Sequence, residues 1–155
     1  HKKGLKVVDK KAGRDSNEGL VESYIHSNGK IGVLVKVMCE TDFVAQNEDF
    51  KEFAHDIALQ IAASSPQYVN AEDVPEEVVA EETADIRKKY EEEGKPADVI
   101  DNIVKGKVSK IREELSLMHQ PLVKDPEKTV KELLVEVTAR LGEKIEIGEF
   151  VRFDI

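Results

Sequence analysis

The stretch LVESYIHSNGKIGVLVKVMC, residues 20–39, decides the fold expected for this chain. Runs rich in β-branched and aromatic residues flank the pair Asn28-Gly29, and Asn-Gly between such runs is the strongest short-range signal for a β-hairpin. The second run, Ile31 to Cys39, is too apolar for a strand with one face in water. The sequence therefore predicts an antiparallel hairpin whose second strand is buried.

A helix is predicted shortly after the hairpin. It begins near Asn47, whose side chain can cap the first free amides, and Glu48 and Asp49 place negative charge at the positive end of the helix dipole. Ser64-Ser65-Pro66 ends it. The apolar residues recur every three or four positions and form one wide face: Phe50, Phe53, Ala54, Ile57, Ala58 and Ile61.

Two long helices with charged outer faces are predicted across about residues 75–115. Pro75 opens the first, and Gly94-Lys95-Pro96 separates it from a second that ends near Leu115. Each helix has a narrow apolar seam, formed by Val78, Val79, Ile86 and Tyr90 on the first and by Ile100, Val104, Val108, Ile111 and Leu115 on the second. Narrow seams indicate that the helices pair with each other. We expect an antiparallel helical hairpin that projects from the body.

The remaining elements are expected to complete the sheet. A shorter helix is predicted from Asp125-Pro126 to a stop at Gly142, followed by a strand of alternating apolar residues over 145–155 with a bulge at Gly148. Two strands, then helices, then one strand predict an α+β fold. We expect a small three-stranded antiparallel sheet packed with helices, plus the projecting helical hairpin.

Composition limits the classes of partner. The chain has 155 residues and a formal net charge of −9, whereas nucleic acids and anionic membranes require dense clusters of Lys and Arg. No apolar stretch approaches the roughly 20 residues that a bilayer span requires. We therefore expect a soluble, cytoplasmic protein with protein partners, no direct nucleic acid and no membrane contact. Residues 1–18 are predicted to be a basic linker, and residues 19–155 the core domain.

Cys39 is the only cysteine, so an internal disulfide is impossible and a reducing compartment is indicated. Two interpretations of its thiol remain open. It is either a buried small hydrophobic residue at the end of a strand, or a thiol at a subunit contact where two copies could cross-link.

Patterns typical of catalysis are missing from the sequence. The four histidines, His1, His26, His55 and His119, have no metal-ligand spacing with one another or with Cys39. His55 lies beside Asp56 on a predicted helix and is interpreted as a surface or boundary residue. No phosphate-binding Gly-rich loop and no Gly-x-Ser-x-Gly elbow occurs. The sequence predicts a protein that is not an enzyme, with no cofactor and no metal site.

The motif Thr41-Asp42-Phe43 lies between the buried strand and the helix that follows it. Thr and Asp side chains can fold the chain back on its own amides, and a loop held by rigid elements on both sides suits a presented contact. The pattern leaves two interpretations of Phe43: a core residue that closes the end of the sheet, or an exposed contact.

The stretch Cys39 to Ala45, CETDFVA, followed by Phe50 and Phe53, resembles the signature of the bacterial translation elongation factor Ts family. Further motifs follow the family's order over nearly the whole chain, and these are KAGR at 11–14, SNGKIGVL at 27–34, GKP at 94–96, QPLV at 120–123 and FVRF at 150–153.

The resemblance implies a guanine nucleotide exchange factor that binds elongation factor Tu and promotes GDP release during translation elongation. It also implies partner-binding residues, which are Thr41, Asp42, Phe43 and Val44. In this family Phe43 would wedge between helices of the GTPase beside the Mg²⁺ and nucleotide site. A wedge that displaces phosphate and Mg²⁺ contacts weakens nucleotide binding without any chemical step.

Two departures from the family pattern lead to further expectations. The family's N-terminal helical module is expected upstream of Lys2, and only one copy of the core is present where longer members have two. A single core implies a C2 homodimer, with the sheet or the final strand as the contact. The alternative function is a dimeric helical-hairpin interaction scaffold without exchange activity, which a nucleotide-release assay distinguishes.

Overall fold

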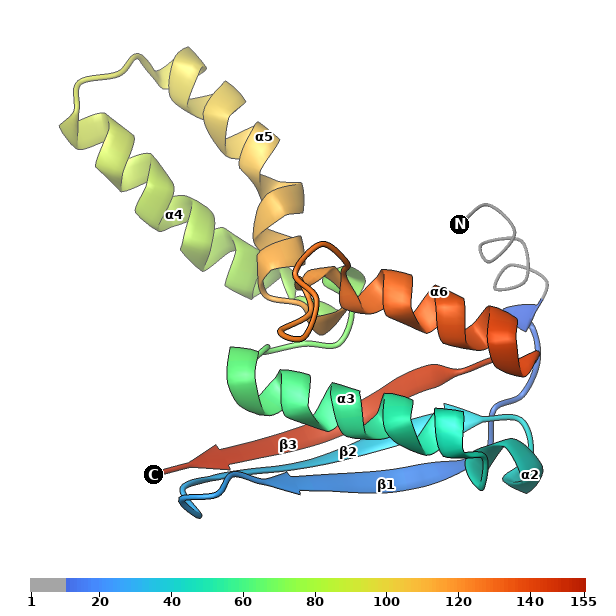
Figure 1. Cartoon of the computed structure of the whole chain (residues 1–155). Coiled ribbons are helices and arrows are strands. Elements are labelled where there is room, and N and C mark those ends of the chain that lie inside the picture. The colour runs from blue at the N-terminus through green and yellow to red at the C-terminus, as the bar shows by residue number, and fades with distance from the viewer. Residues whose placement is uncertain (1–10) are drawn as a thin grey trace. The chain divides into compact units, whose positions relative to one another are not determined.

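The computed structural model describes residues 11–155 and divides the chain into two compact units (Figure 1). The first unit consists of the N-terminal part of the chain up to Ser65 together with Pro121–Ile155, and the second consists of Pro66–Gln120. Residues 1–10 of the predicted linker, with Lys2, lie outside the described residues.

The first unit contains a three-stranded antiparallel sheet. Its strands are β1 (Glu18–Ile25), β2 (Ile31–Cys39) and β3 (Glu146–Asp154), in the order β1-β2-β3. The predicted α+β class and the three-stranded antiparallel sheet are therefore confirmed.

The turn between β1 and β2 follows from its sequence. Gly29 has a φ of 71°, a conformation that an L side chain rarely adopts. The Asn28 side chain accepts a hydrogen bond from the Lys30 amide at 2.9 Å, and the His26 amide donates to the Ile31 carbonyl at 2.9 Å. The predicted hairpin is confirmed.

β2 and β3 pair with one irregularity. Val35 faces Phe150 and Val37 faces Ile147, so Lys36 alone lies opposite two residues of β3. One of these two is Gly148, where a bulge was predicted, and a Cβ atom there would lie 3.2 Å from the Lys36 Cβ.

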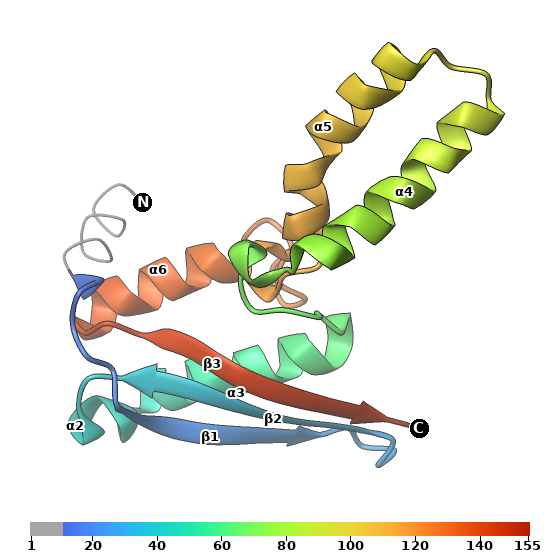
Figure 2. The same cartoon turned by 180° about the vertical axis from the view of Figure 1, so that it is seen from behind.

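One face of the sheet is covered by helices of the same unit (Figures 1 and 2). Helix α3 (Glu48–Ser64) contacts β1 and β2, and helix α6 (Val130–Leu141) contacts α3. Alternate residues of β2 are buried with the predicted apolar face of α3, and the most buried are Val33, Val35, Val37, Cys39, Phe50, Phe53, Ile57 and Ile61. Burial of each such large side chain contributes about 1.5–3 kcal/mol.

Both ends of α3 lie where the sequence predicts them. The Asn47 side chain accepts a hydrogen bond from the Asp49 amide at 2.8 Å, as the predicted cap requires. The helix ends at Ser64, and Ser65 adopts a left-handed conformation with a φ of 49°.

The predicted start of α6 at Asp125-Pro126 is wrong. The helix begins at Val130 because Thr129 and Glu132 form a capping box. The Thr129 hydroxyl accepts from the Glu132 amide at 3.2 Å, and the Glu132 carboxylate accepts from the Thr129 amide at 3.2 Å. The predicted stop is confirmed, since Gly142 caps the helix with a φ of 76°.

The second unit is a helical hairpin. Helices α4 (Glu76–Glu92) and α5 (Ala97–Glu114) contact each other, and Gly94, with a φ of 79°, lies in the turn between them. Their facing seams are buried at Val79, Ile100, Val104 and Ile111. The predicted pair of helices is confirmed, and its projection from the body stays a prediction.

The chain enters and leaves the second unit at neighbouring points, near Tyr68 and near Ser116 and Leu117, and we call these residues the neck. Tyr68 and Ser116 form a parallel bridge, and the Leu117 amide donates to the Tyr68 carbonyl at 2.8 Å. Short 3₁₀ turns, η1 (Ala71–Asp73) and η2 (Leu117–His119), flank it.

Within residues 11–155, every helix falls short of the length and apolarity that a membrane crossing demands.

Candidate partner-binding site

The motif Thr41-Asp42-Phe43 does not form the predicted loop. It opens a short helix, α2 (Asp42–Ala45), and Thr41 is the capping residue with an extended backbone. The Thr41 hydroxyl oxygen accepts a hydrogen bond from the Val44 amide at 3.3 Å. A helix of this length has no apolar periodicity, so the sequence pattern could not reveal it.

The structure separates the predicted contact residues by exposure. Thr41 and Asp42 are exposed, and the Phe43 side chain is 84% exposed. Val44 is only 5% exposed, so in this conformation its side chain anchors α2 and offers a partner little surface. Of the two interpretations of Phe43, the structure supports the exposed one. Contact of these residues with a partner stays a prediction.

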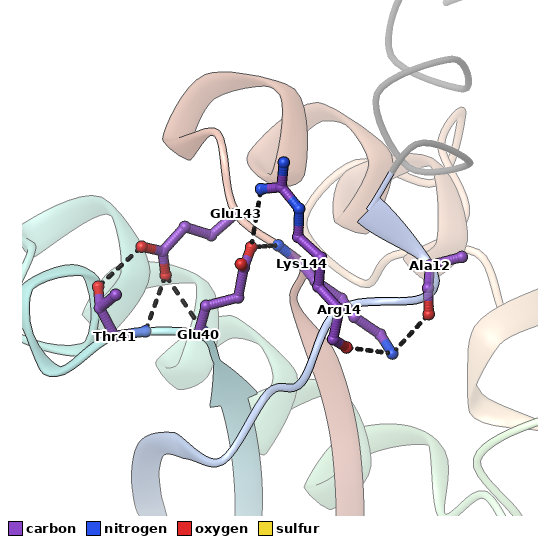
Figure 3. Close-up of polar contacts among 6 residues, drawn as sticks. All are labelled: Ala12, Arg14, Glu40, Thr41, Glu143 and Lys144. Carbon is purple, nitrogen blue, oxygen red and sulfur yellow. Dashed lines mark hydrogen bonds and ion pairs between the residues drawn. The ribbon is translucent and has the colours of Figure 1, made fainter.

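The carboxylate of Glu143 binds the segment that enters α2 (Figure 3). Its Oε1 accepts hydrogen bonds from the amides of Glu40 and Thr41, at 3.1 and 3.0 Å. Its Oε2 accepts from the Thr41 hydroxyl at 2.7 Å. Hydrogen bonds to an ionised acceptor are stronger than neutral ones, so the residue before α2 is firmly held.

Glu40 makes the reciprocal interaction. Its Oε2 accepts from the Lys144 amide at 2.7 Å and lies 3.6 Å from the Arg14 guanidinium. The Lys144 ammonium donates to the carbonyls of Ala12 and Arg14 at 2.8 and 3.1 Å. We call this cluster the polar clamp; its members are Ala12, Arg14, Glu40, Thr41, Glu143 and Lys144 (Figure 3).

Sequence reasoning missed the polar clamp. Glu143 and Thr41 are 102 residues apart in the chain, and no local pattern links them. The one sequence signal for the position of Glu143 was Gly142, because Gly142 ends the helix and Glu143 is the first residue after the turn. That signal identifies the position of Glu143 but not its partner.

Cys39 lies beneath the same segment. Its side chain is 0% exposed, and its thiol donates to the Thr41 carbonyl at 3.2 Å. Burial, and next the negative charge of Glu143, raise the pKa of the Cys39 thiol to about 11. Within a single chain, the structure supports the interpretation of Cys39 as a buried small hydrophobic residue.

The raised pKa predicts a specific loss of stability at alkaline pH. The folded thiol keeps its proton up to a pKa of about 11, whereas the ordinary value is 9.0. Because the folded state binds more protons in this window, its stability falls as pH rises from 9 towards 11. Denaturant unfolding at about pH 8 and about pH 10.5 should show a loss on the order of 1 kcal/mol that Cys39→Ala lacks. Parallel losses in both proteins would contradict the assignment.

Side chains that bind metal ions do not gather in the part of the chain that the structure describes. Between residues 11 and 155, no group of three His, Cys, Asp or Glu side chains could hold a metal ion. His55 is exposed, as expected, and its ring lies 6.2 Å from the Tyr24 ring. His1 lies outside the described residues.

Comparison with known proteins gives consistent matches. Residues 7–155 match the family described as Elongation factor TS. Elongation factor Ts of Caldanaerobacter subterraneus subsp. tengcongensis is 55% identical over 152 residues, which cover 98% of this chain and 76% of the relative. Elongation factor Ts of Carboxydothermus hydrogenoformans is 52% identical over 153 residues, which cover 99% of this chain and 70% of the relative.

Proposed function

The chain belongs to the elongation factor Ts family, and elongation factor Ts is the nucleotide exchange factor for elongation factor Tu. We propose that Phe43 is the residue through which this chain weakens the binding of nucleotide to elongation factor Tu. Elongation factor Ts is not itself an enzyme, so the protein must act by contact alone. We propose that the Phe43 ring inserts beside the Mg²⁺ and nucleotide site of elongation factor Tu. We also propose that this takes place in the cytoplasm.

The observation that carries this proposal is the contrast between side chain and backbone at Phe43. The ring is 84% exposed, yet the backbone is held before and after it, since Thr41, two residues earlier, is bound by Glu143 and the next residue, Val44, is buried. A preorganised aromatic side chain loses little conformational freedom on binding, which favours affinity. Aromatic residues are also the commonest anchors of protein interfaces.

The Asp42 carboxylate is the second exposed group of the site. It lies in the first turn of α2, next to the proposed wedge. We infer that the Asp42 carboxylate contacts the GTPase. We expect it to contribute less to nucleotide release than Phe43, because it acts mainly by supporting the geometry of the turn.

Binding of the factor and of nucleotide must be antagonistic for exchange to occur. If the factor lowers the affinity of elongation factor Tu for GDP, then GDP lowers the affinity for the factor by the same ratio. The incoming nucleotide therefore dissociates the complex between elongation factor Tu and the factor.

The test is the release of labelled GDP from elongation factor Tu. Addition of the chain should accelerate release above the spontaneous rate, and the rate should saturate with factor concentration. If the chain binds elongation factor Tu and release stays at the spontaneous rate, the interaction scaffold is the better description.

We further propose that two copies pair through the open face of the sheet. Several strand residues that point away from α3 are large, apolar and exposed, and these are Val21, Ile25, Leu34, Val151 and Phe153. Leu34 and Val151 are direct cross-strand neighbours. The charges nearby are paired with each other, since Lys36 forms an ion pair with Glu149. A contiguous apolar patch of this kind is typical of an interface, and a C2 pair covers the same patch on both copies.

The pairing predicts a dimer in solution. Sedimentation at micromolar concentration should give twice the 17.4 kDa of one chain. Val151→Glu should give monomers, because it places a carboxylate in the apolar contact of each copy and burial of an unpaired charge is costly. Val123→Glu is the matched control, since both valines are 47% exposed and Val123 lies outside the sheet. A wild-type protein that sediments only as a 17.4 kDa monomer would contradict the proposal.

A further inference from the structure

We propose that Glu143 is a positioning residue for nucleotide exchange, because its carboxylate fixes the turn that presents Phe43. The inference rests on the proposed function of Phe43. Glu143 itself is not proposed to contact elongation factor Tu, whereas Asp42 and Phe43 are.

Both oxygens of the Glu143 carboxylate are used by one short segment of chain. Oε1 accepts the amides of Glu40 and Thr41, and Oε2 accepts the Thr41 hydroxyl. These donors come from the last residues before α2. The carboxylate therefore fixes the position from which α2 starts.

The Thr41 hydroxyl transmits this orientation to α2. A hydroxyl has one proton, and at 2.7 Å from Glu143 Oε2 that proton is donated to the carboxylate. Only lone pairs then remain to accept the Val44 amide at 3.3 Å, which is the capping bond of α2. Without the carboxylate, the hydroxyl is free to rotate and the cap is no longer fixed.

Helix α2 depends on such external support because it has only 4 residues. A single helical turn does not sustain itself in water. Its C-terminal half is held by the buried Val44 and Ala45, whereas its N-terminal half, with Asp42 and Phe43, is exposed. The support at this exposed end comes from Thr41 and, through it, from Glu143.

The location of Glu143 follows from the end of α6. Gly142 turns the chain with a φ of 76°, and the next residue then faces the end of β2. The Glu40 carboxylate accepts the Lys144 amide at 2.7 Å in return, so the two segments are tied from both sides. A change at Glu143 should therefore disturb the turn without unfolding α6.

The test measures exchange and stability separately. For Glu143→Ala we expect the rate of GDP release at saturating factor to fall by about tenfold or more, since small displacements of a positioned group cost large factors in rate. Glu143→Gln covers the case in which the Ala variant does not fold. The Gln oxygen can still accept both amides, but its amide nitrogen cannot accept the Thr41 hydroxyl. The saturating rate should therefore still fall, with a smaller decrease in melting temperature.

Glu132→Ala is the matched control. The Glu132 carboxylate also accepts an amide and a hydroxyl, those of Thr129, but at the start of α6. This variant should lose melting temperature and keep the wild-type saturating rate. If Glu132→Ala slows exchange as much as Glu143→Ala does, general destabilisation explains both, and the proposal is wrong.

A double-mutant cycle with Phe43→Ala separates this inference from the proposed function. If Glu143 acts through Phe43, Glu143→Ala should cause no further loss of rate in the Phe43→Ala protein, while its effect on melting temperature stays the same. An unchanged rate for Phe43→Ala alone would refute the proposed function. If Phe43→Ala slows exchange, the proposed function stands, and this inference is overturned by a normal rate for Glu143→Ala or by independent, multiplicative effects.

Discussion

Phe43→Ala should slow the release of GDP from elongation factor Tu by about thirtyfold at saturating factor. Truncation of an aromatic anchor at an interface costs about 2 kcal/mol or more, and each 1.4 kcal/mol is about a factor of ten. The free energy of unfolding should change little. The ring is 84% exposed, so it loses only a small part of the roughly 3–5 kcal/mol that a buried Phe→Ala change costs.

Phe50→Ala is the control for this prediction. It makes the same chemical change at a side chain that is 0% exposed, so it should lower the free energy of unfolding by about 3–5 kcal/mol. The fraction of this variant that remains folded should exchange nucleotide normally. The reverse pattern, in which Phe43→Ala unfolds the chain and refolded material exchanges normally, would return Phe43 to the core. Asp42→Ala should give a smaller defect in exchange than Phe43→Ala.

Gly19→Ala should be the most damaging small substitution in the sheet. Gly19 has a φ of 148°, and a Cβ atom there would lie 2.1 Å from the Val37 carbonyl oxygen and 2.8 Å from the Met38 Cα. These atoms belong to the backbone of β2, so the clash is relieved only if β1 separates from its partner. We expect the free energy of unfolding to fall by about 3 kcal/mol or more, measured by denaturant titration.

Gly106→Ala provides the opposite expectation for the same chemical change. Gly106 lies within α5, and a Cβ atom there meets nothing within 4 Å. Ala is favoured over Gly in a helix by up to about 1 kcal/mol, so this variant should be more stable than the wild type. Equal unfolding midpoints for the two variants would contradict the structural basis of both expectations.

Elements governed by neighbouring residues were predictable from the sequence. The hairpin follows from Asn28-Gly29, and α3 follows from the spacing of its apolar residues and from the Asn47 cap. The start of α6 was misplaced because Asp125-Pro126 is itself a plausible helix start. The decisive signal was the pair Thr129 and Glu132, which has the spacing of a capping box.

The candidate site was predictable in part. The motif Thr41-Asp42-Phe43 could be located, but its residue pattern alone did not decide the exposure of Phe43, because the same pattern suits a core residue; only the family resemblance implied a contact. The anchoring of Thr41 by Glu143 depends on contacts across 102 residues of chain. Such contacts arise from the tertiary fold, and sequence periodicity does not report them.

The neck of the second unit has a consequence for how this chain can change during evolution. Its entry and exit are joined by the Leu117 amide and the Tyr68 carbonyl, 2.8 Å apart, and Gly94 lies in the turn between the two helices. If α4 and α5 gain or lose the same number of helical turns on the two sides of Gly94, the bridge between Tyr68 and Ser116 can keep its geometry. The hairpin is thus a segment whose length selection can adjust while the residues at the neck stay in place.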